Sequence, residues 1–248
     1  MKKLILALLI LAGTVHAQSL IVISGSKTAS GGGPNTWTLV RHTLVIAPCN
    51  NSTSCTAAVS AIGSGNLLVL VEVGSSASAY INGGFGSTGG TWVHPGGSSA
   101  GACNVQGVVG SDCIYVLHTT SCSSSCNIPF TTSGYFSFDS ADIFEYTPST
   151  GTATFDTANT SSGTFNATPP GVALTISGTS DLVIQNIAAQ DHYCTAISSP
   201  YTSATDFTVS PNVQQAGYAA AVNLSSVSAP TWTCAGMTRY SVGAVAFK

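Results

Sequence analysis

The strongest indication of a sheet in this chain is the apolar run Leu67-Leu68-Val69-Leu70-Val71. Its side chains are continuously apolar, with no polar residue alternating between them. A short run of this kind is typical of a strand that is covered on both faces, because a half-exposed strand alternates apolar and polar residues. We therefore expect residues 67–71 to form a central strand of a sheet.

Similar short runs recur along the chain between clusters of Gly, Ser, Pro and Asn. They are rich in Val, Ile, Thr, Tyr and Phe, and they lie at 36–47, 66–73, 113–119, 135–146, 172–176, 182–188, 215–224 and 238–247, with weaker runs at 153–155 and 206–209. Such runs predict strands. The Ala-rich segment 216–222 is ambiguous, and its neighbours favour a strand. The sequence predicts an all-β fold, an antiparallel, jelly-roll-like β-sandwich stapled by disulfides, with the last run built into a sheet.

The composition is unusual for a soluble protein. Of 248 residues, 6% are charged and 44% hydrophobic, and 65 are Ser or Thr. A typical domain has about 25% charged residues. The six Lys and Arg residues argue against nucleic-acid binding, which needs clustered basic side chains. The length allows one large β domain, which we place at 18–248, with 18–60 left open as an N-terminal extension.

The N-terminus resembles a secretory signal peptide. Lys2 and Lys3 form a positive end, residues 4–12 an apolar run, and Val15-His16-Ala17 a small-x-small cleavage site. We predict a signal peptide at 1–17 and a secreted protein, extracellular or periplasmic. A retained anchor is the alternative, but the apolar run is too short to span a bilayer, and no later run is long enough to do so.

Eight cysteines follow the predicted cleavage site: Cys49, Cys55, Cys103, Cys113, Cys122, Cys126, Cys194 and Cys234. An even number in an exported chain predicts disulfides, whose connectivity the sequence leaves open. The simplest pairing is sequential. It closes three short loops and one long loop, Cys194–Cys234, which would stabilise the fold most. A thiolate metal site is disfavoured because no C-x-x-C occurs, and we predict no metal or cofactor.

Several strand motifs, taken in order, resemble a loose group of secreted bacterial Ser/Thr/Gly-rich β-sandwich domains. They are Gly65-Asn66-Leu67-Leu68-Val69, Phe144-Glu145-Tyr146, Asp181-Leu182-Val183-Ile184 and Ala244-Val245-Ala246-Phe247-Lys248. Pro34-Asn35-Thr36-Trp37-Thr38 is similar to the group's hairpin motif, but here it precedes the first of these strands. The resemblance implies a lectin-like or jelly-roll sandwich of extracellular or envelope proteins, and it transfers no catalytic residue.

Acidic residues are few, and three of them lie on or near one predicted strand: Asp139, Asp142 and Glu145. Asp142 is in register with the aromatic, core-facing residues, where burial would raise its pKa as a general acid requires. Asp139 and Glu145 are about 20 Å apart along a strand, whereas glycosidase carboxylates are about 5–9.5 Å apart. Asp142 and Glu145 are our candidate catalytic residues, with a partner needed from another strand. The alternative is that Asp142 bonds at a strand bend and Glu145 is solvated.

Two other motifs carry little weight. Residues 97–101 match G-x-S-x-G, with Asp191 and His192 later in the chain, but no helix follows the serine as the hydrolase motif requires. His192 beside Asp191 is the best candidate for an oriented imidazole or a metal ligand.

Aromatic residues beside Gly/Asn-rich turns suggest contacts to sugars. The candidate ligand-binding residues are Trp37, Trp92, Tyr80, Asn82 and Tyr201, although Trp in a sandwich is as often core, as we expect for Trp232. Our first hypothesis is a secreted binding or surface protein that recognises neutral glycan. The alternatives are a polysaccharide-directed hydrolase that uses carboxylates, and a structural subunit that self-assembles in an envelope or filament.

Overall fold

The computed structural model describes residues 35–46, 54–63, 65–74, 110–117, 122–131, 139–190, 194–204, 214–235 and 237–248. Contacts divide the chain into two compact units, Met1–Gly32 and Gly33–Lys248, and all described residues belong to the second. In the described part the regular elements are strands, and every pairing is antiparallel. The predicted all-β, antiparallel class is confirmed.

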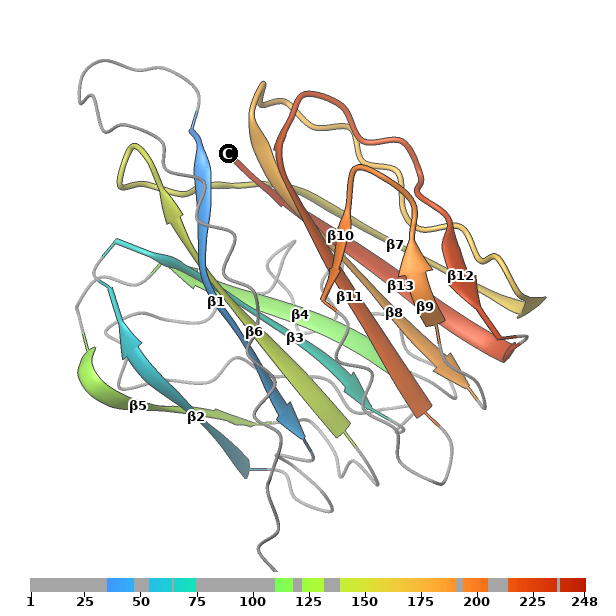
Figure 1. Cartoon of the computed structure of the whole chain (residues 1–248), viewed down its shortest axis with the longest axis horizontal. Coiled ribbons are helices and arrows are strands. Elements are labelled where there is room, and N and C mark those ends of the chain that lie inside the picture. The colour runs from blue at the N-terminus through green and yellow to red at the C-terminus, as the bar shows by residue number, and fades with distance from the viewer. Residues whose placement is uncertain are drawn as a thin grey trace, which may run out of the picture. The chain divides into compact units, whose positions relative to one another are not determined.

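Two larger sheets and two strand pairs make up the described fold (Figure 1). The four-stranded sheet has the order β1 (Trp37–Ile46), β6 (Asp139–Pro148), β3 (Leu67–Gly74), β4 (Gly110–Leu117). The five-stranded sheet has the order β10 (Thr202–Ala204), β11 (Gln214–Leu224), β8 (Asp181–Gln190), β13 (Met237–Phe247), β7 (Phe155–Asn166). The pairs are β12 (Trp232–Cys234) with β9 (Cys194–Ile197), and β2 (Ser54–Ile62) with β5 (Cys122–Thr131).

The apolar run 67–71 lies in an interior strand, as predicted. β3 pairs with β6 on one side and β4 on the other. Leu67, Leu68 and Val69, whose side chains point alternately to the two faces, are all buried. Both faces of β3 are therefore covered at this end of the strand.

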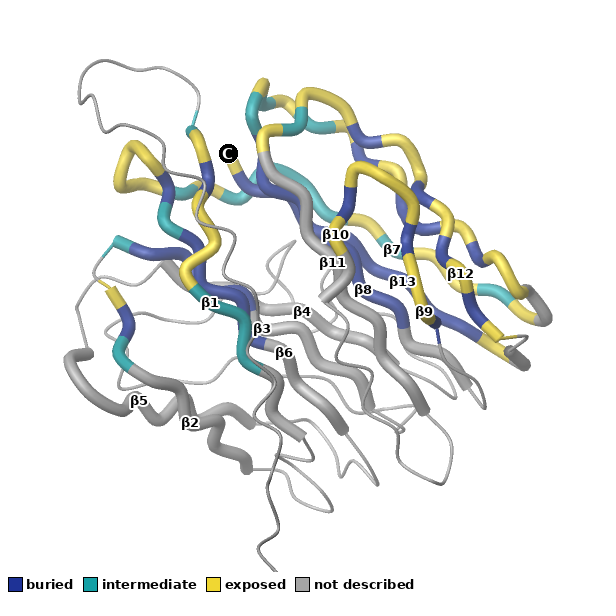
Figure 2. Tube along the Cα trace, viewed as in Figure 1, coloured by how far each residue is buried: buried dark blue, intermediate teal, exposed yellow. Residues whose placement is uncertain are grey.

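The strands β8 and β13 are adjacent interior strands of the five-stranded sheet, and they are also buried on both faces (Figure 2). Side chains on one face, including Val183, Val242 and Ala244, join a cluster with Trp232. Side chains on the other face join a second cluster that contains residues of both larger sheets: Trp37, Leu67, Val69, Phe144, Tyr146, Leu182, Ile184, Val245 and Phe247. The prediction that the last strand is built into a sheet is confirmed.

Some predicted elements differ from the structure. Residues 172–176 form no strand, because Leu174 makes only an isolated bridge to Val227 and the main chain of Val172 bonds to the side chain of Gln185 rather than to the main chain of a strand. The predicted short run at 153–155 overlaps the long strand β7 only at Phe155, and the rest of β7 was not predicted because it is polar. Cys55, Cys122 and Cys126 lie in paired strands, where loops were expected. The predicted run 206–209 lies outside the described residues.

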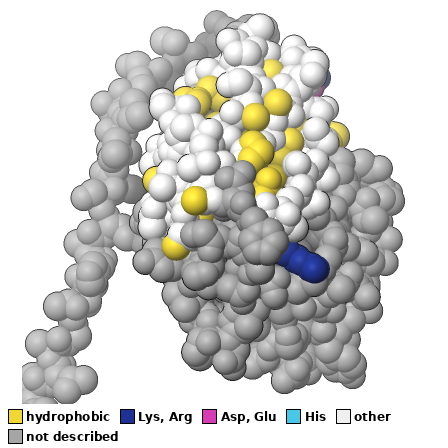
Figure 3. All heavy atoms as spheres, turned by 90° about the vertical axis from the view of Figure 1, so that its right-hand side faces the viewer, with side chains coloured by type: hydrophobic (Ala, Val, Ile, Leu, Met, Phe, Trp, Pro, Cys, Tyr) yellow, Lys and Arg dark blue, Asp and Glu magenta, His cyan; other side chains and the backbone are white. Residues whose placement is uncertain are grey.

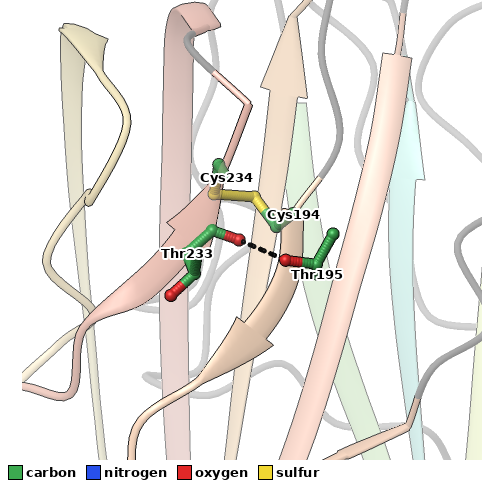
Figure 4. The surroundings of a disulfide bond; sticks show 4 residues. All are labelled: Cys194, Thr195, Thr233 and Cys234. Carbon is green, nitrogen blue, oxygen red and sulfur yellow. Dashed lines mark hydrogen bonds between the residues drawn. A yellow bond between two sulfur atoms is a disulfide. The ribbon is translucent and has the colours of Figure 1, made fainter.

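The predicted disulfide Cys194–Cys234 is present and joins β9 to β12 (Figure 4). Beside it, Thr195 Oγ1 donates a hydrogen bond of 3.3 Å to the Thr233 carbonyl. Trp232 is fully buried in the cluster that contains both cysteines, as predicted. The side chains of the other six cysteines lie outside the described residues, so their pairing remains a prediction.

Within the described ranges, no helix is long and apolar enough to cross a membrane. In the same ranges, no group of three or more His, Cys, Asp or Glu side chains is placed to hold a metal ion.

Candidate functional site

A shallow pocket of about 60 Å³ lies between two loops of the described structure. One loop, 198–201, follows β9, and the other, 224–230, leads from β11 toward β12. The lining is Ser198, Ser199, Pro200, Tyr201, Leu224, Ser226, Val227, Ser228, Ala229 and Pro230. It contains four serine hydroxyls and no charged side chain.

Hydrogen bonds to neighbouring residues hold each of the two loops in place. The Ser198 amide donates to the Thr231 carbonyl at 2.9 Å, and the Thr231 amide donates to Ser198 Oγ at 2.9 Å. On the other loop, the Gly171 amide donates to the Pro230 carbonyl at 2.6 Å. A Cβ at residue 171 would lie 2.5 Å from Pro230 Cγ, so only glycine permits this approach. The rim of the pocket is therefore held by hydrogen bonds in which backbone amides donate.

Tyr201 is one of the residues that line the pocket, and Gln185 of β8 positions its hydroxyl. The tyrosine is 8% exposed, and Gln185 Nε2 donates to its hydroxyl at 3.2 Å. Gln185 is itself buried and bonds both main-chain groups of Val172, at 3.0 Å and 2.7 Å. Burial raises the pKa of Tyr201, so the phenol stays neutral. A neutral hydroxyl backed by a fixed amide suits recognition of another hydroxyl.

The lining of this pocket offers hydrogen bonding and apolar contact. Serine hydroxyls both donate and accept hydrogen bonds, and proline and valine supply apolar contact. The lining contains no carboxylate, imidazole or amine that would act as an acid, base or nucleophile. Figure 3 shows a face whose described part is dominated by uncharged groups, with hydrophobic side chains among them.

Glu145, one of the two candidate catalytic residues, is fully buried in a network of bonds. Its Oε1 accepts hydrogen bonds from the Gly63 amide at 3.1 Å and from Asn66 Nδ2 at 2.5 Å. Its Oε2 lies 2.6 Å from Arg41 Nε. The alternative that Glu145 is solvated is wrong, because these partners replace water. The arrangement joins β6, β1 and the turn before β3, and the catalytic role remains a prediction.

Of the predicted ligand-binding residues, the structure describes Trp37 and Tyr201, which pack in different core clusters. Trp37 is 5% exposed and packs in the cluster shared by the two larger sheets, where its Nε1 donates to the Ser180 carbonyl at 2.9 Å. The side chain of Asp142 is outside the described structure. So are the residues Tyr80, Asn82, Trp92, Asp191 and His192 and the motif at 97–101. Of the predicted ligand-binding residues, Tyr201 lies at the pocket.

Sequence reasoning missed a cluster formed by Asp156, Ser177, Asp181 and Lys248. These residues lie far apart in the chain, and their approach depends on the pairing of β7, β13 and β8. The available signal was the scarcity of acidic residues, which makes Asp156 and Asp181 conspicuous in neutral segments.

No family of known proteins, no curated protein and no solved structure matches this chain.

Proposed function

We propose that the chain is a secreted protein with a jelly-roll-like β-sandwich that binds neutral glycan at the pocket formed by loops 198–201 and 224–230. The observation that carries the proposal is the pocket lining, which combines four serine hydroxyls and Tyr201 with apolar proline and valine and has no charge. Neutral sugars present hydroxyls and C–H faces, and this lining complements both.

Other observations support the fold and the compartment in this proposal. One core cluster contains side chains of both larger sheets, as a sandwich requires. The Cys194–Cys234 disulfide is typical of an oxidising compartment. The resemblance to secreted Ser/Thr/Gly-rich sandwich domains points in the same direction.

A pull-down with insoluble neutral polysaccharides tests the function. The panel is cellulose, chitin, mannan and β-1,3-glucan, and retention is compared between the unmodified protein, Ser228→Glu and Ser161→Glu. Residue 228 is exposed at the pocket and residue 161 is exposed on β7, so the two variants add the same charge at different places. We expect Ser228→Glu to weaken retention about tenfold and Ser161→Glu to have no effect. Absence of binding to every polysaccharide, or equal binding by both variants, would contradict the proposal.

One observation favours a second candidate function, self-assembly. In the described structure β7 is an edge strand with a single neighbour, β13, and no charged residue follows Asp156 along it. Sheet edges are usually protected by charges, because a bare edge invites pairing with another chain. Sedimentation of the protein at high concentration tests this candidate. We expect the unmodified protein to form an oligomer as its concentration rises, and we expect Ser162→Lys to abolish this oligomer. A protein that stays monomeric at every concentration would refute self-assembly.

A further inference from the structure

Three strand ends meet at the cluster of Asp156, Ser177, Asp181 and Lys248. On β13, Phe247 pairs with Phe155 of β7 and with Leu182 of β8. Ala246 pairs with Thr157, so Asp156 is the extra residue of a β-bulge. Bulges turn a side chain away from the regular alternation. Asp156 and Asp181 are thereby brought to the same end of three adjacent strands, next to Lys248.

Asp156 has a full set of donors. Ser177 Oγ and the Ser177 amide donate to its two oxygens at 2.5 Å and 2.6 Å, and Lys248 Nζ lies 3.1 Å from Oδ1. Lys248 Nζ also donates to Ser177 Oγ at 2.7 Å. Burial alone would raise the pKa of Asp156, but Ser177, Lys248 and the neighbouring Asp181 together hold it below its usual range. Asp156 is therefore ionised.

Asp181 is in the opposite situation. It is fully buried, and neither of its oxygens accepts a well-formed hydrogen bond from a described residue. A Cβ at residue 178 would lie 1.6 Å from Asp181 Oδ1, so the chain passes directly over this carboxyl group. Burial, and then the facing Asp156 carboxylate, raise the pKa of Asp181 to about 7, while Lys248 and the poorly aligned Gly178 amide act in the other direction.

Two facing carboxylates require either a proton or a cation between them. The Lys248 ammonium already occupies one side of Asp156 and would repel a metal ion. Two carboxyl groups are also fewer oxygen ligands than Ca²⁺ takes, and the described residues supply no third acidic or histidine ligand here. The arrangement favours a proton, held on Asp181 and directed at Asp156.

We propose that Asp156 and Asp181 form a proton-operated clasp, in which one shared proton keeps the adjoining ends of β7, β8 and β13 together and its loss loosens them. The main chain at this point is a reciprocal pair of hydrogen bonds. The Thr154 amide donates to the Lys248 carbonyl at 2.8 Å, and the Lys248 amide donates to the Thr154 carbonyl at 2.9 Å. Two charged carboxylates beside this pair, one on β7 and one on β8, would repel each other across the end of β13 and weaken its pairing with both strands.

The direction of the pH effect follows from proton counts. The pKa of Asp181 is 3.8 in the unfolded chain and about 7 in the folded protein. Between these two pH values the folded protein therefore holds a proton on Asp181 that the unfolded chain has lost. The stability due to Asp181 is therefore complete below about pH 4 and is lost as the pH rises through about 7. Asp156 has the reverse dependence, because its pKa is lowered: its contribution is lost as the pH falls below its usual range.

Thermal unfolding and amide exchange test the clasp. We expect the melting temperature of the unmodified protein to fall by about 5 °C between about pH 5.5 and about pH 8.5. Exchange of the Thr154 and Lys248 amides, corrected for intrinsic rates, should become about tenfold faster over the same interval. Asp181→Asn imitates the protonated acid and should remove both changes. Asp139→Asn in β6, which removes a charge elsewhere, should leave both in place.

Two results would overturn the proposal. One is a pH profile of Asp181→Asn that parallels that of the unmodified protein. The other is a rise in melting temperature on adding Ca²⁺ at about pH 8.5 that Asp181→Asn abolishes, because the pair would then hold a cation. If Asp181→Asn does not fold, carbon NMR of the aspartate carboxyls in the unmodified protein decides: a carboxyl that titrates near neutrality supports the clasp, and its absence refutes it.

Discussion

Glu145 joins three chain segments through one carboxylate, and its substitution is the clearest test at the scale of a residue. Glu145→Gln keeps the shape but removes the charge opposite Arg41, whose side chain is 22% exposed. Breaking a buried ion pair on one side costs about 3–5 kcal/mol, because the remaining charge keeps its desolvation cost. We expect Glu145→Gln to lower the free energy of unfolding by about 3 kcal/mol, the lower end of this range, because water partly solvates Arg41. Urea unfolding followed by tryptophan fluorescence measures it.

Arg239→Gln is the control for this measurement. Arg239 lies on β13 and is exposed, so its substitution should change stability by less than about 0.5 kcal/mol. If Glu145→Gln and the unmodified protein were equally stable, the network would contribute no net stability. The desolvation cost of the buried ion pair would then cancel its attraction.

Individual residues differ in how far their roles follow from the sequence. Trp232 was predicted as core because it lies two positions from Cys234, and local spacing was enough. Glu145 was a candidate catalytic residue with solvation as the alternative, and its buried ion pair did not follow from the sequence, because Arg41 is opposite it only in the β1–β6 register. The pair Asp156 and Asp181 was missed for the same reason, since a bulge in β7 brings them together. Contacts set by strand pairing do not appear in a single sequence.

The strand pair β9–β12 carries a prediction at the scale of an element. The disulfide spans a sequence separation of 40 residues, and the loop-entropy relation gives about 4 kcal/mol for a loop of that length. The double variant Cys194→Ser, Cys234→Ser avoids a free thiol and should lose stability of that order. Because β9 leads directly into the loop 198–201, polysaccharide retention should weaken as well. Chemical unfolding and the pull-down measure the two effects, and unchanged values for both would refute this prediction.

The strands that were predicted well share a physical property. β3, β8 and β13 are interior strands, and their apolar residues cover both faces, which leaves a strong signal in the sequence. β7 gives a weak signal because it is an edge strand rich in Ser and Thr, and its pairing with β13 depends on main-chain hydrogen bonds that any residue except proline can form. The short strands β9 and β12 contain no long apolar run that would predict them. They are held in the core by the Cys194–Cys234 disulfide and the buried indole of Trp232.

At the scale of the molecule, the two core clusters meet across β8 and β13. These strands send alternate side chains into each cluster, so each cluster is built on the same two strands. The sequence predicted this class of structure because the class follows from apolar runs and turn residues. It did not predict the site, because the pocket is made by loops 198–201 and 224–230, whose serines look like ordinary turn residues.

A pair of truncations tests the dependence of the whole fold on its last strand. A chain that ends at Gly236 lacks β13, which would separate β7 from β8 and remove residues from both clusters. We expect it to bind the dye ANS and to show no cooperative unfolding. A chain that starts at Gly33 keeps the whole second unit and should unfold cooperatively. Cooperative unfolding of the first chain, followed by circular dichroism, would show that β13 is dispensable, and it would contradict a core that depends on this strand.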